Sequence, residues 1–302
     1  MSVSDIRSRA LARARLYQAI RQFFAERNVL EVETPLLCEY TVTDPHIHSF
    51  SVPVGNKHYY LQTSPEYAMK RLLANGSGSI YQITKSFRQG EAGKKHHPEF
   101  SMLEWYRVGF NHHDLMDELD ALLQATINAK PAEKITYRDL FLKYANVDPF
   151  SDNNFQAIFS DNNINATVDA DKDTCLDILL SHCIEPHLGF EKPLFVHDFP
   201  ASQAALAKMN KGVAERFELY INGLEIANGF HELTDASEQE KRFQENQAMR
   251  RAQHKFVPDI DVDLIKALKK GLPDCAGVAV GLDRLLMVLT QANDIQEVLF
   301  FN

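Results

Sequence analysis

The chain reads SFR at residues 86–88, HHPEFSMLEWY at 96–106 and GVAVGLDR at 277–284. Arg88 follows an apolar run typical of a strand, and Arg284 stands where an apolar helical run begins. A cation in the first turn of a helix opposes the helix dipole at a cost of about 0.3 kcal/mol or more, so we expect a ligand to account for Arg284. A guanidinium offers several parallel donors to phosphate or carboxylate oxygens. The two arginines therefore predict a site for anions.

A β-hairpin is predicted where Asn222-Gly223 separates two alternating runs. With that turn as the centre, Tyr220 pairs with Glu225, and Glu218 shares their face on the diagonal. Diagonal neighbours lie roughly 7–8 Å apart, close enough for two glutamates to share one cation. Oxygen ligands and phosphates are how Mg²⁺ is usually held, although a solvated polar face would show the same alternation. The hairpin therefore predicts a metal site or a solvated face.

Glu232 continues the same run but lies an odd number of residues beyond Glu225. In a regular strand it would point to the opposite face. An extra residue in the strand restores the phase, and we expect such a bulge at Asn228-Gly229.

In this order and spacing the two arginine stretches resemble motifs 2 and 3 of the class II aminoacyl-tRNA synthetases, and the resemblance covers nearly the whole chain. A helix over 6–28 and a strand that ends at Pro35 resemble motif 1, which builds the dimer interface of that family. The resemblance implies an α+β fold, with a mainly antiparallel sheet flanked by helices, in a single catalytic domain over residues 1–302. Residues 148–173, which are rich in Asp and Asn, are expected to form a polar surface insertion. No anticodon-binding domain is expected.

The family pattern implies a role in ATP binding for each motif. Arg88 would hold the α-phosphate and the substrate carboxylate, Phe100 would stack on adenine, and Arg284 would reach the γ-phosphate; both arginines would be catalytic. Glu218 and Glu225 would bind Mg²⁺. The implied ATP-binding residues are Arg88, Gln89, Gly90, His96, His97, Phe100, Glu225, Ile226, Gly281 and Arg284.

Among the class II enzymes the chain most resembles the lysyl-tRNA synthetases. That resemblance implies that Glu66 meets the α-amino group of the substrate, while Glu232 and Tyr106 close on its distal ammonium. The implied substrate-binding residues are Ser64, Pro65, Glu66, Tyr106, Asn228, Glu232 and Ala279.

Three positions of the chain depart from the usual pattern. Ala279 replaces a glycine, which narrows the amino-acid site. Gly90 replaces an acid that contacts adenine, so backbone groups or Glu91 must take its place, or nucleotide affinity is weaker. His97 replaces an asparagine before Pro98.

In its short length and in the presence of Ala279, the chain resembles a group of lysyl-tRNA synthetase paralogues that ligate lysine or β-lysine to elongation factor P. That resemblance implies ATP-dependent formation of an aminoacyl-adenylate and transfer to a lysine side chain of this acceptor protein, by a homodimer that uses ATP and Mg²⁺. Two alternatives stay open. One is a stand-alone ligase like a truncated lysyl-tRNA synthetase or an asparagine synthetase, and the other is a non-catalytic regulatory paralogue. The complete set of Arg88, Glu218, Glu225 and Arg284 favours an enzyme.

The composition is typical of a globular cytoplasmic protein. Of 302 residues, 45% are hydrophobic and 24% charged, and no apolar stretch approaches the roughly 20 residues of a membrane span. The first residues lack the apolar segment of a secretion signal. Four scattered cysteines suggest reduced thiols rather than a disulfide framework. A net charge of −9 disfavours a broad nucleic-acid-binding surface, so tRNA is not expected as a partner.

Overall fold

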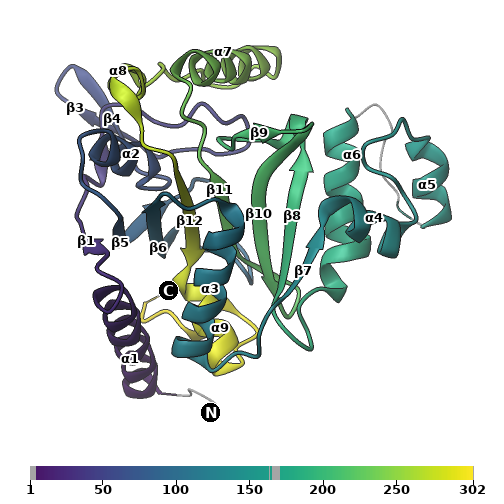
Figure 1. The fold of residues 1–302 in the computed structure, drawn as a ribbon, viewed down its shortest axis with the longest axis horizontal. Helices are drawn as coiled ribbons and strands as arrows, with labels where there is room; N and C mark the ends of the chain where they lie inside the picture. Colours follow the sequence, from purple (N-terminus) through teal and green to yellow (C-terminus); the bar gives the residue numbers. More distant parts are fainter. Residues whose placement is uncertain (1–4, 163, 165–170, 302) are drawn as a thin grey trace. The chain divides into compact units, whose positions relative to one another are not determined.

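The computed structural model describes residues 5–162, 164 and 171–301, and its contacts divide the chain into two compact units (Figure 1). The first unit contains Met1–Phe110 and Glu232–Asn302, and the second contains Asn111–His231. Both combine helices with mainly antiparallel strands, so the predicted α+β class is confirmed.

The sheet of the first unit contains four strands in the order β1, β5, β6, β12. Their bounds are Leu30–Glu31, Ile80–Phe87, Glu99–Val108 and Cys275–Gly281. β1 runs parallel to β5, and the other two pairs are antiparallel. In this register Glu104 lies opposite Ala279, and Tyr106 lies opposite Gly277. Because side chains alternate along a strand, these four residues share one face of the sheet.

Helix α1 (Ile6–Ala25) covers an apolar part of the first unit. It ends three residues before the predicted limit of 28, and Asp5 accepts a hydrogen bond from the Ser8 amide at its start. Phe24 is fully buried and lies 4.4 Å from the ring centroid of Tyr81 and 5.3 Å from that of Trp105. This aromatic cluster fixes the helix on β5 and β6.

The other elements of the first unit surround this sheet. The helices are α2 (Glu66–Ala74), α7 (Ala236–Ala252), α8 (Val262–Gly271) and α9 (Leu282–Thr290). A small antiparallel sheet contains β2 (Leu37–Cys38), β4 (Lys57–Leu61) and β3 (Ser51–Val54). The helix predicted near Arg284 is confirmed as α9, which begins two residues earlier.

The second unit contains the paired strands β11, β10, β8 and β7 in that order, with β9 beside β10. The bounds are Leu224–His231, Val213–Ile221, Leu194–Pro200, Glu133–Thr136 and Met209–Asn210. The predicted hairpin is confirmed, because Tyr220 pairs with Glu225 around a turn at Asn222 and Gly223. Both turn residues have positive φ, 52° and 69°, as a two-residue hairpin turn of this type requires.

A bulge interrupts this hairpin, but not where the sequence indicated. Leu219 pairs with Ala227 and Tyr220 pairs with Glu225, so the extra residue is Ile226. From Glu218–Asn228 onward the pairing is regular. The prediction of a bulge at Asn228-Gly229 was therefore wrong by two residues. The Ile226 bulge puts Asn228 in phase with Glu225.

Helices of the second unit pack on its sheet around a buried apolar core that includes Tyr137, Phe141 and Phe199. The helices are α3 (His112–Ile127), α4 (Tyr137–Ala145), α5 (Phe155–Asp161) and α6 (Lys172–Leu179). The region predicted as a surface insertion, 148–173, contains α5 and the start of α6, while residues 163 and 165–170 lie outside the described residues. Over the described ranges, none of the helices combines the length and apolarity that crossing a membrane requires.

Candidate active site

A buried charge cluster occupies the first unit and contains Glu66, Lys70, Glu104, Tyr106 and Glu232. The Lys70 ammonium lies 2.7 Å from Glu66 Oε1 and 2.6 Å from Glu232 Oε2. Tyr106 donates its hydroxyl hydrogen to Glu104 Oε1 at 2.7 Å, and Ser64 donates to Glu104 Oε2 at 2.9 Å. The predicted residues Glu66, Tyr106 and Glu232 are therefore brought together, with Ser64 beside them.

The cluster is acidic in excess. It holds three carboxyl groups against the single ammonium of Lys70, and Glu104, Glu232 and Lys70 are at most 2% exposed. Burial, and next the charge of Glu66, raises the pKa of Glu104. Burial also raises the pKa of Glu232, although the charge of Lys70 opposes this shift. Burial alone would lower the pKa of Lys70, but the charges of Glu232 and Glu66 outweigh this effect and raise it. Burying a charge without a counter-ion costs free energy. The cluster is therefore suited to bind a group that carries additional positive charge.

Strand β12 forms a close-fitting wall of the cluster. A Cβ atom on Gly277 would lie 2.2 Å from the Tyr106 ring and 2.6 Å from Glu232 Oε1, so only glycine fits. Ala279 lies two residues along the same face, opposite Glu104. Its methyl group thus points to the side on which Glu104 and Tyr106 stand. Pro65 precedes α2 and places Glu66 in the first helical turn.

Arg88 lies at the end of β5, where its side chain is one-quarter exposed. Its guanidinium carbon lies 5.2 Å from the Phe100 ring centroid, and Nε donates to the Thr63 carbonyl at 3.4 Å. Glu91 Oε1 lies 3.6 Å from Arg88 Nη1. Gly90 has a φ of +87°, a conformation that favours glycine over an acid. The carboxylate of this loop is therefore carried by Glu91, beside Arg88.

Arg284 meets the loop between β5 and β6. Its Nη2 atom lies 2.6 Å from His96 Nε2, and Nε donates to the Lys95 carbonyl at 3.2 Å. The His97 ring accepts a hydrogen bond from the Glu99 amide at 3.2 Å, so histidine can shape the turn before β6. Gly281 is the N-cap residue of α9. In the loop after β5, the backbone amide of Gln89 donates to the His48 carbonyl at 2.7 Å.

Asp283, next to Arg284, is a buried anchor for these motifs. Its Oδ2 atom accepts from the Ser101 amide at 2.6 Å, and its Oδ1 atom lies 2.6 Å from Arg13 Nη2 on α1. Asp283 is 2% exposed. The three sequence motifs of the first unit, on α1, β6 and α9, are thus linked through one carboxylate.

The predicted metal-binding acids lie in the second unit, on one face of the β10–β11 hairpin. Glu218 contacts Arg216 through Oε1 and accepts from the Tyr220 hydroxyl through Oε2 at 2.6 Å. Burial is the main cause that raises the pKa of Glu218 to about 7; the charge of Glu225 adds to it and Arg216 opposes it. The two carboxylates are therefore close enough to repel each other. Hard oxygen donors of this kind fit Mg²⁺, and Arg216 already offsets part of their charge.

Asn228 and Ile226 share the hairpin with these acids. Asn228 pairs with Glu218 in the register, and its Oδ1 atom is buried without a hydrogen-bond partner among the described residues. Such an oxygen is costly to bury and suits a donor from a ligand. Ile226, at the bulge, is 2% exposed, so its side chain packs and only its backbone is suited to contact a nucleotide.

Comparison with known proteins identifies the family. The family described as tRNA synthetases class II (D, K and N) matches residues 1–302. The chain belongs to this family. It is 49% identical to the elongation factor P–(R)-β-lysine ligase of Vibrio atlanticus, over 96% of this chain and 94% of the relative. It is 49% identical to the enzyme of that name from Vibrio cholerae, over 99% and 95%, and 47% identical to that of Salmonella typhi, over 96% and 94%.

Several charged groups that contact the predicted site residues were missed by the sequence analysis. Lys70 stands four residues after Glu66 on α2, and Glu104 alternates with Tyr106 on β6, so each spacing held a signal of a shared face. Arg216 likewise precedes Glu218 by two residues on β10. These signals are local, whereas the contact between Lys70 and Glu232 joins distant parts of the sequence.

Proposed function

We propose that this protein activates lysine or β-lysine with ATP as an aminoacyl-adenylate and transfers the aminoacyl group to a lysine side chain of elongation factor P. The observation that carries the proposal is the buried charge cluster, with its three carboxyl groups and one ammonium. Lysine and β-lysine each carry two ammonium groups. A substrate with two cations would balance the cluster, whereas aspartate would add a further negative charge.

The relatives support the acceptor. Proteins at 47–49% identity over nearly the whole chain carry the name elongation factor P–(R)-β-lysine ligase. Ala279, which faces the same side as Glu104, agrees with a substrate whose amino group is displaced from the α-carbon.

The reaction has two steps that need no side-chain nucleophile. A carboxylate oxygen of the substrate attacks the α-phosphorus of ATP, the bond to pyrophosphate breaks, and the adenylate forms. The neutral lysine amine of the acceptor then attacks the carbonyl carbon, the bond to AMP breaks, and the new amide loses a proton to solvent. We assign Arg88 and Arg284 to the negative charge on the phosphates, by positioning and electrostatic stabilisation. Mg²⁺, which Glu218 and Glu225 would hold, supplies further neutralisation of phosphate charge when bound.

ATP–pyrophosphate exchange tests the first step separately from the acceptor. Exchange should occur with β-lysine, more weakly with α-lysine, and not with aspartate. Transfer is then followed as a mass increase of purified elongation factor P, with lysine tRNA as the comparison acceptor. Exchange with aspartate alone would contradict the substrate, and aminoacylation of tRNA without modification of elongation factor P would contradict the acceptor.

We also propose that the protein is a homodimer built through α1 and the segment after it. Large apolar side chains are exposed there, and they are Ile6, Leu11, Leu30, Leu36 and Leu37, each more than 40% exposed. Light scattering at micromolar concentration should give the dimer mass, and a monomer would contradict the proposal.

A further inference from the structure

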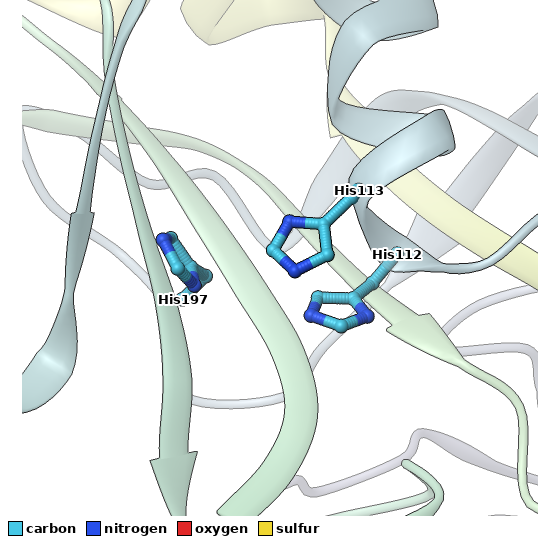
Figure 2. Close-up of side chains that lie close together, drawn as sticks. All are labelled: His112, His113 and His197. Atoms are coloured by element: carbon cyan, nitrogen blue, oxygen red, sulfur yellow. The ribbon is translucent and has the colours of Figure 1, made fainter.

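Three histidines gather in the second unit, outside the proposed active site (Figure 2). His112 and His113 are the first residues of α3, and His197 lies on β8. One ring nitrogen from each lies within 4.8 Å of the others. The His113 ring centroid is 4.0 Å from that of His112 and 5.3 Å from that of His197. Two separate elements thus bring three imidazoles to one point.

The most buried histidine of the group is His112. His112 is 4% exposed, and within the described part of the chain neither of its ring nitrogens makes a hydrogen bond of good geometry. Its Nε2 atom lies 3.3 Å from Asp198 Oδ1, and His197 Nδ1 lies 3.0 Å from Asp198 Oδ2. A single carboxylate therefore stands beside both rings, next to one nitrogen of each.

We propose that His112, His113 and His197 bind one divalent transition-metal ion of the zinc class. Imidazole nitrogens are donors that Zn²⁺, Co²⁺ and Ni²⁺ prefer, whereas Mg²⁺ prefers oxygen. Three protein ligands leave a fourth position of a tetrahedron for water. Asp198 would orient the rings, as carboxylates beside metal-bound histidines commonly do. The site is reached from solvent, because His113 is exposed.

A second set of donors shares His112 and contains Glu215 and His231. The carboxylate of Glu215 is already satisfied, since Oε1 accepts from the Asn210 amide at 2.8 Å and Oε2 lies 2.5 Å from His231 Nδ1. That arrangement needs no metal to explain it. Because Glu215 and His231 already pair with each other, the set of three histidines is the better candidate for a metal.

The surroundings of the site contain charges of both signs. The start of α3 opposes a cation through its helix dipole, and Lys211 lines the adjoining cavity of about 470 Å³. Asp198 and Glu215 line the same cavity and offset these charges. Three imidazoles with one orienting carboxylate thus suit a divalent ion of the zinc class better than they suit Mg²⁺, which prefers oxygen ligands.

This metal site is separate from the one proposed for Mg²⁺. His197 pairs with Phe217 in the register of β8 and β10, and Glu218 is the next residue on β10. Because neighbouring side chains point to opposite faces of a sheet, His197 and Glu218 lie on opposite faces. A metal at the histidines would link the start of α3 to β8 and leave the acids of the hairpin untouched.

The test measures binding of Zn²⁺ and Co²⁺ to full-length protein freed of any affinity tag, in excess Mg²⁺ to fill carboxylate sites. We expect one ion per chain by calorimetry, a Co²⁺ spectrum with the intense visible bands of tetrahedral coordination, and a higher melting temperature with Zn²⁺. His113→Gln and His197→Gln should each weaken binding by at least about 10- to 100-fold. Circular dichroism verifies that both variants fold, which matters most for His197 because its side chain is only 12% exposed.

Two control variants separate the possible results. His58→Gln removes a lone exposed histidine and should leave affinity unchanged. Glu215→Gln should also retain the metal. Unmodified protein that binds no ion, or binds as weakly as His113→Gln, would overturn the proposal. Loss of binding in Glu215→Gln with full binding in His113→Gln and His197→Gln would overturn the choice of ligands.

Discussion

The ammonium of Lys70 lies 2.6 Å from Oε2 of Glu232, and both side chains are at most 2% exposed. This pair joins helix α2 to the residue that follows strand β11. Removing one partner of a buried ion pair leaves an uncompensated charge, which costs more than the pair itself contributes. Lys70 is therefore a residue on which both the stability and the charge balance of the cluster depend.

Replacing Lys70 by methionine should destabilise the protein by about 3 kcal/mol, the lower end of the usual range because Glu232 can take up a proton instead. Urea unfolding followed by circular dichroism measures the change. Lys57→Met is the matched control, since the pair of Lys57 with Glu39 is exposed on both sides and should contribute less than about 1 kcal/mol. Equal stabilities for the two variants would contradict the burial argument.

Substrate binding should strengthen as pH rises from 6 to 8. Burial, and next the charge of Glu66, raises the pKa of Glu104 to about 8, so below pH 8 this carboxyl group is largely neutral in the free protein. An ammonium needs the charged form, so binding releases protons, and affinity should rise by roughly tenfold per pH unit for each proton released. Calorimetry in buffers of different ionisation enthalpy counts those protons. Affinity that is constant between pH 6 and 8 would contradict the assignment of Glu104 to the substrate site.

Glu225→Gln should abolish ATP–pyrophosphate exchange at any Mg²⁺ concentration while the protein remains folded. The change removes a charged oxygen donor but keeps the size of the side chain. Glu133→Gln, on the surface beside Lys192, controls for the loss of one acid elsewhere. Near-normal exchange in Glu225→Gln would show that the hairpin acids form only a polar face.

Arg88→Ala should cost about 3 kcal/mol of transition-state stabilisation, similar to the loss of a key oxyanion donor. The comparison is of kcat/KM for adenylate formation. Arg138→Ala removes an exposed arginine paired with Asp148 and should leave kcat/KM unchanged. A reduction of only a few-fold in Arg88→Ala would place this side chain outside the reaction.

Ala279→Gly should shift the ratio of exchange rates from β-lysine toward α-lysine. Ala279 faces the same side as Glu104. Removing one methyl group from a binding site changes the preference between two substrates by about 10- to 200-fold at most. Ala276→Gly deletes a buried methyl group from the opposite face of β12; it should lower stability without changing the ratio. Equal rates for both isomers in the unmodified protein would contradict this account of specificity.

The sequence predicted best those features that depend on neighbouring residues. The turn at Asn222-Gly223 and its first pairs were correct, because two residues with positive φ specify the hairpin. The position of the bulge was missed, because the choice of Ile226 over Asn228 depends on packing of both strands. The family resemblance supplied Glu66 and Glu232.

Lys70, by contrast, was missed because its role depends on a contact between segments far apart in the chain. A lysine four residues after a glutamate on a helix ordinarily forms an exposed pair of little consequence. Only the fold shows that this lysine is 2% exposed and has a second carboxylate partner. The role of Lys70 therefore depends on its burial and on a contact between distant segments of the chain, and not on the local sequence pattern.

The discontinuity of the first unit governs the order in which this protein can be completed during synthesis. Glu66 and Glu104 belong to the segment that is translated first, whereas Glu232, Gly277 and Arg284 belong to the segment that is translated last. Every residue of the second unit is added to the growing chain before any of that last segment exists. Lys70 therefore lacks its partner Glu232 until the second unit has been made, and the buried charge cluster is completed only as synthesis of the polypeptide ends.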